Sequence, residues 1–278
     1  MPEKEVINGL ALCAGIGGLE LGLRRALPDY RTVCYVEREA SSVELLLAGQ
    51  ESDDLDPAPV WDDLLTFDER PWRGVVDLIS AGYPCQPFSS AGKRTGTAGR
   101  RHLWPRVAKI IERVEPGIVF LENVAGHLLR GFRDVAGDLH RMGFRVAARL
   151  LTADAIGAPH RRERLFILAV ADGRRVGLAE LRAAYDGSGG DAPWNLTHGC
   201  DSGLGPFPPP PCDLAAWRKL LSERPDLAPG LAHQRRIRGV ADGLPSRVDR
   251  LSALGNAVVP AMATRALCDL AAELRAAQ

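Results

Sequence analysis

The chain has 278 residues, of which 46% are hydrophobic and 25% charged, enough for one large or two unequal globular domains. Its 35 basic and 35 acidic residues give a formal net charge of zero, which excludes a uniformly basic nucleic-acid binder but not a local basic stripe. The six cysteines form no Cys-x-x-Cys pair, so the pattern indicates neither a disulfide framework nor a zinc site. No apolar run approaches the roughly 20 residues of a membrane helix, and the charged residues 1–5 do not resemble a signal peptide. Together with the scattered cysteines, these features lead us to expect a cytoplasmic protein without a bound metal.

Short apolar runs alternate with helical patterns from about residue 7 to residue 170. Strands are predicted at 7–14, 33–36, 75–80, 118–121 and 165–170, and helices at 19–26, 40–48 and 107–114. This alternation predicts an α/β fold with a mostly parallel sheet covered on both faces. Ligands bind at the carboxyl ends of such strands, where we expect Gly15, Glu37, Asp63, Cys85 and Glu122.

The region that follows has a different composition. Residues 172–239 contain a Gly-Ser-Gly-Gly run and four consecutive prolines, which are typical of a small, loop-rich insert. Helical patterns return at 247–254 and from 261 onward. The predicted organisation is a catalytic and cofactor-binding domain at 1–171, an insert at 172–239, and a segment at 240–278 that returns to the first domain.

A glycine cluster lies between the first strand and the first helix, in Ala14-Gly15-Ile16-Gly17-Gly18. Glycines there let the backbone approach a ligand, and the helix start offers free N–H donors. The dinucleotide fingerprint is not met, because Glu20 stands where its third glycine should be. Glu37 ends the next strand and is placed to accept hydrogen bonds from ribose hydroxyls. Asp63, after Asp62, suggests a contact with an adenine amino group, although either aspartate also suits a helix cap.

A cysteine bracketed by two prolines follows the strand at 75–80. Pro84-Cys85-Gln86-Pro87 reads as a stiff turn that displays its side chains, unlike a cysteine packed within a strand. Basic residues up to Arg106 favour a thiolate and suggest a loop that closes over a phosphate backbone. The simpler interpretation of this stretch is a solvated loop.

Two further groups suit acid–base or anion chemistry. Glu122 lies one helix and one strand beyond Cys85, which places both at one edge of neighbouring strands and suits proton transfer to a ring nitrogen. Arg162 and Arg164 are two apart, so in extended chain they face the same way and can converge on a carbonyl oxygen or a phosphate. A solvated strand start is the alternative for the arginine pair.

Together these segments resemble the DNA (cytosine-5)-methyltransferase family, of the bacterial or phage restriction-modification type, over residues 7–170 and 240–278. The similar segments occur in family order at 14–18, 84–89, 122–124, 162–164 and 255–260. The chain departs from the family pattern at Cys13, where a bulky residue is frequent, and at His160, where glutamine is frequent.

The resemblance implies a Rossmann-like fold that binds S-adenosylmethionine and methylates carbon 5 of a flipped cytosine at a short site in double-stranded DNA. It implies that Cys85 attacks carbon 6, that Glu122 binds ring nitrogen 3, and that Arg164 binds the carbonyl oxygen with support from Arg162. The cofactor residues it implies are Cys13, Ala14, Gly15, Ile16, Gly17, Gly18, Glu37, Arg38, Asp63, Leu64, Pro84, Leu103, Asn256 and Ala257. The expected DNA contacts are Gln86, Ser89, Ser90, Lys93, Arg94, Arg235 and Arg236, with the insert at 172–239 as the target-recognition region.

The resemblance further implies a monomer, a bacterial or phage-encoded protein, and a cognate restriction endonuclease as a functional partner. Four alternatives are open at this point. A tRNA cytosine-5 methyltransferase shares the fold, but the Cys-Phe-Thr tripeptide of that branch is missing from the sequence. A non-catalytic nucleic-acid-binding relative would be expected to lack the cysteine or the glutamate. A dinucleotide oxidoreductase or an amino-group methyltransferase fits less well, because their fingerprints are not found.

Overall fold

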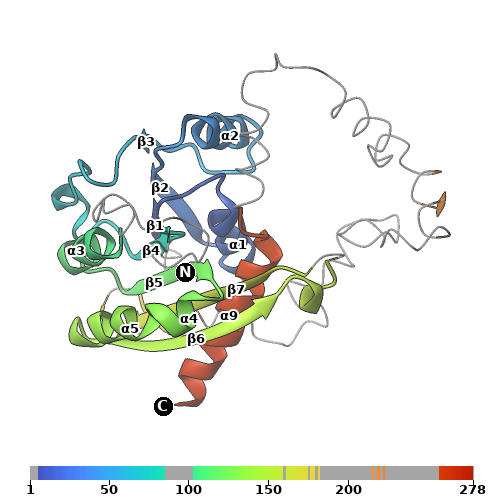
Figure 1. Cartoon of the computed structure of the whole chain (residues 1–278). Coiled ribbons are helices and arrows are strands. Elements are labelled where there is room, and N and C mark those ends of the chain that lie inside the picture. Colours follow the sequence, from blue (N-terminus) through green and yellow to red (C-terminus); the bar gives the residue numbers. More distant parts are fainter. Residues whose placement is uncertain are drawn as a thin grey trace, which may run out of the picture.

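The computed structural model describes residues 6–84, 103–158, 161–174, 176–178, 181 and 257–277, together with positions 215, 218, 219 and 222. A seven-stranded sheet with the order β3-β2-β1-β4-β5-β7-β6 forms the centre of this part of the chain (Figure 1). Helices pack on both of its faces. The α/β architecture with a mostly parallel sheet is therefore confirmed.

Five strands run parallel, and two complete the sheet in antiparallel pairing. The parallel strands are β1 (Ile7–Leu12), β2 (Tyr30–Val36), β3 (Val60–Trp61), β4 (Leu78–Ala81) and β5 (Ile118–Val124). The antiparallel strands are β7 (Glu163–Ala171), beside β5, and β6 (Phe144–Thr152) at the edge. Because β7 runs opposite to β5, its first residues lie beside the last residues of β5, where Arg164 pairs with Val124.

The helices divide between the two faces of the sheet. One face is covered by α1 (Gly18–Ala26), α2 (Ala40–Glu51) and α9 (Pro260–Ala276), and the other by α3 (Trp104–Val114) and α5 (Phe132–Arg141). The short elements are α4 (His127–Arg130) and the 3-10 turns η1 (Arg70–Trp72) and η2 (Asp154–Ile156). In α3 the buried residues recur every three or four positions, which turns one apolar stripe toward the sheet.

The closing helix packs closely on the first helix, although it comes from the far end of the chain. A Cβ at Gly22 would lie 2.5 Å from the Cβ of Ala263, so only glycine allows this approach. The Thr264 hydroxyl also donates to the Gly22 carbonyl oxygen at 2.9 Å. The helix predicted from 261 onward is confirmed as α9, and it shares a hydrophobic core with α1 and the sheet.

Several details differ from the sequence-based expectations. β5 extends to Val124, so Glu122 lies inside the strand rather than just after it, because β7 continues the pairing. β6 and α5 were not predicted, since Arg145 and Arg149 interrupt the apolar pattern of β6 and Gly137 weakens that of α5. The helix expected at 247–254 lies outside the described residues, as does most of 172–239, so the domain division stays a prediction.

Candidate active site

The glycine turn after β1 is built from residues with left-handed backbone conformations. Cys13, Gly15 and Gly17 have φ angles of 51°, 58° and 81°, which fold the chain sharply from β1 into α1. Gly17 is the N-cap residue of α1. A Cβ built at Gly15 would meet nothing within 4 Å, so the backbone here borders open space. Such a turn offers a ligand both room and backbone N–H donors.

Glu37 joins this turn to the end of β2. Its Oε2 accepts the Gly15 N–H at 2.7 Å, and its Oε1 accepts the N–H groups of Arg38 and Glu39, each at 2.8 Å. The carboxylate is therefore fixed at the carboxyl edge of β1 and β2, beside the open space at Gly15. A carboxylate in this place, next to a glycine turn, fits the ribose of a nucleoside cofactor.

The closing segment lies against the same turn. A Cβ at Gly18 would stand 2.5 Å from the carbonyl oxygen of Val258, so residues before α9 contact the start of α1 directly. Ala257 is half-buried here, whereas Asn256 lies outside the described residues. The segment that contains the predicted cofactor residue Ala257 therefore lies beside the glycine turn.

The loop after β3 contains the predicted adenine contact. Asp63 uses its Oδ1 to accept the Leu65 N–H at 2.9 Å, which makes a local turn, and Leu64 is buried. The sequence left open a helix cap for this aspartate, but in the structure one of its two carboxylate oxygens closes a turn and no α-helix begins there. Asp63 follows Trp61 of β3, whose carbonyl oxygen accepts the Glu37 N–H at 2.9 Å, so the loop begins beside Glu37.

The end of β4 leads to the predicted nucleophile. The chain is described as far as Pro84, and Cys85 lies outside the described residues. The predicted DNA contacts also lie outside them: Gln86, Ser89, Ser90, Lys93, Arg94, Arg235 and Arg236. The description resumes at Leu103, which precedes α3 and is half-buried beside the core of that face.

Tyr83 ties the end of β4 to its neighbours. Its carbonyl oxygen accepts a hydrogen bond from Asn123 Nδ2 at 3.0 Å, and its hydroxyl lies 3.0 Å from His127 Nε2. Its ring also contacts Trp104 at the start of α3, with centroids 5.4 Å apart. Sequence reasoning did not single out Tyr83 or His127, because a lone histidine gives no pattern. Asn123 lies within the similar segment 122–124, for which only Glu122 had a predicted role.

Glu122 lies beside the end of β4, the stem that leads to the predicted nucleophile, and it faces the arginine pair. Its carboxyl group is almost fully buried, and Oε1 is 2.8 Å from Arg164 Nε. Burial raises the pKa of Glu122 to about 7, against the opposing charges of Arg164 and Arg162. Burial and the neighbouring Arg164 lower the pKa of Arg162. The structure thus brings Glu122, Arg162 and Arg164 together, in a site able to hold or release a proton near neutral pH.

The described residues contain no group of three or more His, Cys, Asp or Glu side chains placed to hold a metal ion. Within them, no helix is long and apolar enough to cross a membrane. Burial also raises the pKa of the Cys13 thiol to about 12, so Cys13 is suited to packing rather than to nucleophilic attack.

Comparison with known proteins gives a consistent result. A family model described as C-5 cytosine-specific DNA methylase matches residues 7–184. Among curated relatives, the Type II methyltransferase M.NgoMIV of Neisseria gonorrhoeae is 31% identical, over 59% of this chain and 51% of its own length. M.Eco47II of Escherichia coli is 32% identical, over 60% of this chain and 40% of its own length. The chain therefore spans about half or less of the length of these relatives.

Solved structures agree on the fold. Spodoptera frugiperda DNMT2, in a mutant form, has a TM-score of 0.51 at 20% identity, covering 61% of this chain and 51% of that protein. S. pombe Dnmt2 has the same TM-score and identity, with 61% and 52% covered. Because the family model matches more than half of the residues, from β1 past the end of β7, the chain belongs to the C-5 cytosine-specific DNA methylase family.

Proposed function

We propose that this protein transfers a methyl group from S-adenosylmethionine to carbon 5 of cytosine at a short site in double-stranded DNA. The observation that supports this most is the buried cluster of Glu122, Arg162 and Arg164 beside the stem that leads to Cys85. Membership of the family supplies the reaction class. The glycine turn and Glu37 fit the cofactor, which brings an electrophilic methyl group when bound.

The chain's own residues supply the activation of the base. Carbon 5 of cytosine is a weak nucleophile, and addition of the Cys85 thiolate to carbon 6 makes it electron-rich. Carbon 5 then attacks the methyl group, a proton acceptor removes the proton from carbon 5, and the thiolate leaves carbon 6. Because carbon 6 is blocked within a stacked duplex, the cytosine must first be flipped out of the helix.

Glu122 has the protonation behaviour that this reaction needs. With a pKa of about 7, the carboxyl group holds its proton in a large share of molecules at neutral pH. The protonated form can donate to ring nitrogen 3 as electrons move into the ring, and the second oxygen can accept from the exocyclic amine. Arg164, which lies beside Glu122, would bind the carbonyl oxygen of the cytosine, with support from Arg162.

The insert at 172–239 is the proposed target-recognition region. Its basic residues would bind phosphates, while polar side chains would read base edges in the major groove. We propose that the protein is a monomer and that it acts in the cytoplasm of a bacterial or phage-infected cell. Its functional partner would be a cognate restriction endonuclease.

Methyl transfer from labelled S-adenosylmethionine to duplex DNA and to tRNA tests the proposal. We expect label in duplex DNA only, lost in Cys85→Ala, and bisulfite sequencing of DNA from expressing cells should show one short sequence context. Label in tRNA alone would assign the protein to RNA modification. A protein that binds S-adenosylhomocysteine and DNA but transfers no label would be a non-catalytic relative, which also contradicts the proposal.

A further inference from the structure

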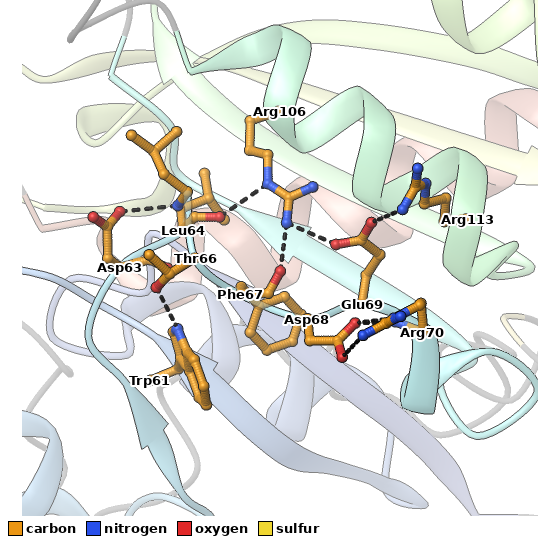
Figure 2. A network of polar contacts seen from close by, with 11 residues as sticks. Trp61, Asp63, Leu64, Thr66, Phe67, Asp68, Glu69, Arg70, Arg106 and Arg113 are labelled. Carbon is orange, nitrogen blue, oxygen red and sulfur yellow. Dashed lines mark hydrogen bonds and ion pairs between the residues drawn. The ribbon is translucent and has the colours of Figure 1, made fainter.

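The loop that contains Asp63 is held from outside by one arginine of α3. Arg106 Nε donates to the Leu64 carbonyl oxygen at 3.0 Å, and Arg106 Nη2 donates to the Phe67 carbonyl oxygen and, at 2.7 Å, to Glu69 (Figure 2). One guanidinium thus binds three residues of the segment between β3 and β4. Two of the three acceptors are backbone carbonyls, so the contact fixes the path of the chain and not only a side chain.

This contact is largely shielded from water. The side chain of Arg106 is 17% exposed and that of Glu69 is 4% exposed. Burial alone would raise the pKa of Glu69, but hydrogen bonds from Arg106 and Arg113 outweigh it and the pKa is lowered. A buried, charge-assisted contact of this kind resists competition from water far better than a surface ion pair.

Arg113 contacts the same carboxylate, and among the described residues it makes no hydrogen bond to the backbone of 64–67. Its Nη1 donates to Glu69 Oε1 at 2.8 Å, and its side chain is half exposed. The two arginines lie about two turns apart on α3 and share one acceptor residue (Figure 2). Arg113 is therefore a matched control for the charge of the network.

The backbone that Arg106 holds also orients Asp63. Asp63 Oδ1 accepts the N–H of Leu65, the residue directly after Leu64, and the Asp63 carbonyl oxygen accepts the Thr66 N–H at 3.1 Å. The turn is closed locally, and Arg106 attaches it to α3 at Leu64 and Phe67. A displacement of the backbone at Leu64 would turn the Asp63 carboxylate with it.

We propose that Arg106 is a positioning residue for adenine recognition. By holding the backbone of residues 64–67 on α3, it presets the Asp63 carboxylate toward the exocyclic amino group of the cofactor's adenine. The inference rests on the proposed function, because it assumes that the cofactor is an adenine nucleoside bound beside Glu37.

Two ligands that differ at position 6 of the purine ring test the proposal. Calorimetry would measure the Kd of S-adenosylhomocysteine and of S-inosylhomocysteine, in which a carbonyl oxygen replaces the amine and ring nitrogen 1 gains a proton, for the wild type, Arg106→Gln and Arg113→Gln. We expect Arg106→Gln to weaken S-adenosylhomocysteine binding about tenfold and S-inosylhomocysteine binding by less than about twofold, so that discrimination is lost. Arg113→Gln should leave both Kd values within about twofold of the wild type.

Equal weakening of both ligands in Arg106→Gln would show a general loosening of the fold and overturn the proposal, as would unchanged discrimination. If Arg106→Gln does not fold, Arg106→Lys keeps the charge for Glu69 but loses the fork to the carbonyls, and the same loss of discrimination is expected. A wild-type protein that binds neither ligand would overturn the proposed function itself. Wild-type binding with discrimination that survives in the Arg106 variants would overturn only the role of Arg106.

Discussion

Glu37 and Glu122 both lie at the carboxyl ends of parallel strands, but they are held in different ways. Glu37 is fixed by three backbone N–H groups from the turn after β1 and from its own loop. Glu122 is buried against the side chains of two arginines, and burial raises its pKa to about 7. The first arrangement suits a permanent hydrogen-bond acceptor for a ligand, whereas the second suits a group that exchanges a proton. Variants at the two glutamates should therefore separate affinity from turnover.

The largest effect is expected at Glu122. Glu122→Gln removes the exchangeable proton, so kcat should fall about a thousandfold, while the Kd of S-adenosylhomocysteine stays within about twofold. Single-turnover methyl transfer and calorimetry would measure the two quantities. Glu163→Gln, an exposed carboxylate next to Arg164, is the control and should keep full activity. A kcat within tenfold of the wild type for Glu122→Gln would contradict the assigned role.

A second buried carboxyl group should make stability depend on pH. Glu20 is buried, its Oε1 accepts the Ser80 hydroxyl hydrogen bond at 2.6 Å, and its Oε2 has no hydrogen-bond partner among the described residues. Burial raises its pKa to about 7, with the Ser80 hydrogen bond opposing the shift.

Because the folded state holds this proton more tightly than the unfolded state, the stability that Glu20 contributes is complete below about pH 4.5 and is lost as the pH rises to about 7. The loss is about 3 kcal/mol. Urea unfolding between pH 5 and 8 would show a flatter profile for Glu20→Gln than for the wild type. Parallel profiles would argue against a protonated Glu20.

A substitution at Glu37 should change the affinity for the cofactor but not turnover. Glu37→Gln keeps one acceptor oxygen but loses the charge, so the Kd of S-adenosylhomocysteine should rise about thirtyfold, or about 2 kcal/mol. At saturating cofactor, kcat should stay within about threefold of the wild type. If Glu37→Gln instead lowered kcat with an unchanged Kd, the separate roles proposed for Glu37 and Glu122 would be wrong.

The smallest effect concerns the packing of α1 on α9, next to the glycine turn. Gly22→Ala should destabilise the protein by about 1 to 2 kcal/mol, because the added Cβ would collide with Ala263 of α9. Gly137→Ala is the matched control, since its Cβ would meet nothing within 4 Å in α5, and it should stabilise the protein by about 0.5 kcal/mol. Thermal unfolding of both variants tests this contrast, which would fail if both shifted in the same direction.

Much of the fold was predictable because its signals are local. The apolar runs of β1 and β4, the glycine turn and the one-sided pattern of α3 each specify an element without knowledge of the rest. β6 was not predictable, because Arg145 and Arg149 reach partners on distant elements, at Asp172 and at Asp269, that explain their place in a strand. Such partners appear only in the folded chain.

The proximity of Glu122 to the arginine pair was predictable, but the contacts that support these residues were not. Glu37, Glu122 and the arginine pair follow from strand ends and spacing, together with the family resemblance. The extension of β5 through Glu122 depends on its antiparallel partner β7, which the sequence does not orient. The contacts of Tyr83 with His127 and of Arg106 with Leu64 join residues about 40 positions apart and belong to no repeating pattern.

The central claim is that Cys85 attacks a flipped cytosine while Glu122 binds the ring. Duplex DNA carrying 5-fluorocytosine at the target site tests it most directly, because fluorine blocks the final elimination. With S-adenosylmethionine present, we expect a denaturation-stable protein–DNA complex that is lost in Cys85→Ala and forms far more slowly in Glu122→Gln. A wild-type protein that binds S-adenosylhomocysteine and methylates DNA but forms no such complex would contradict the account.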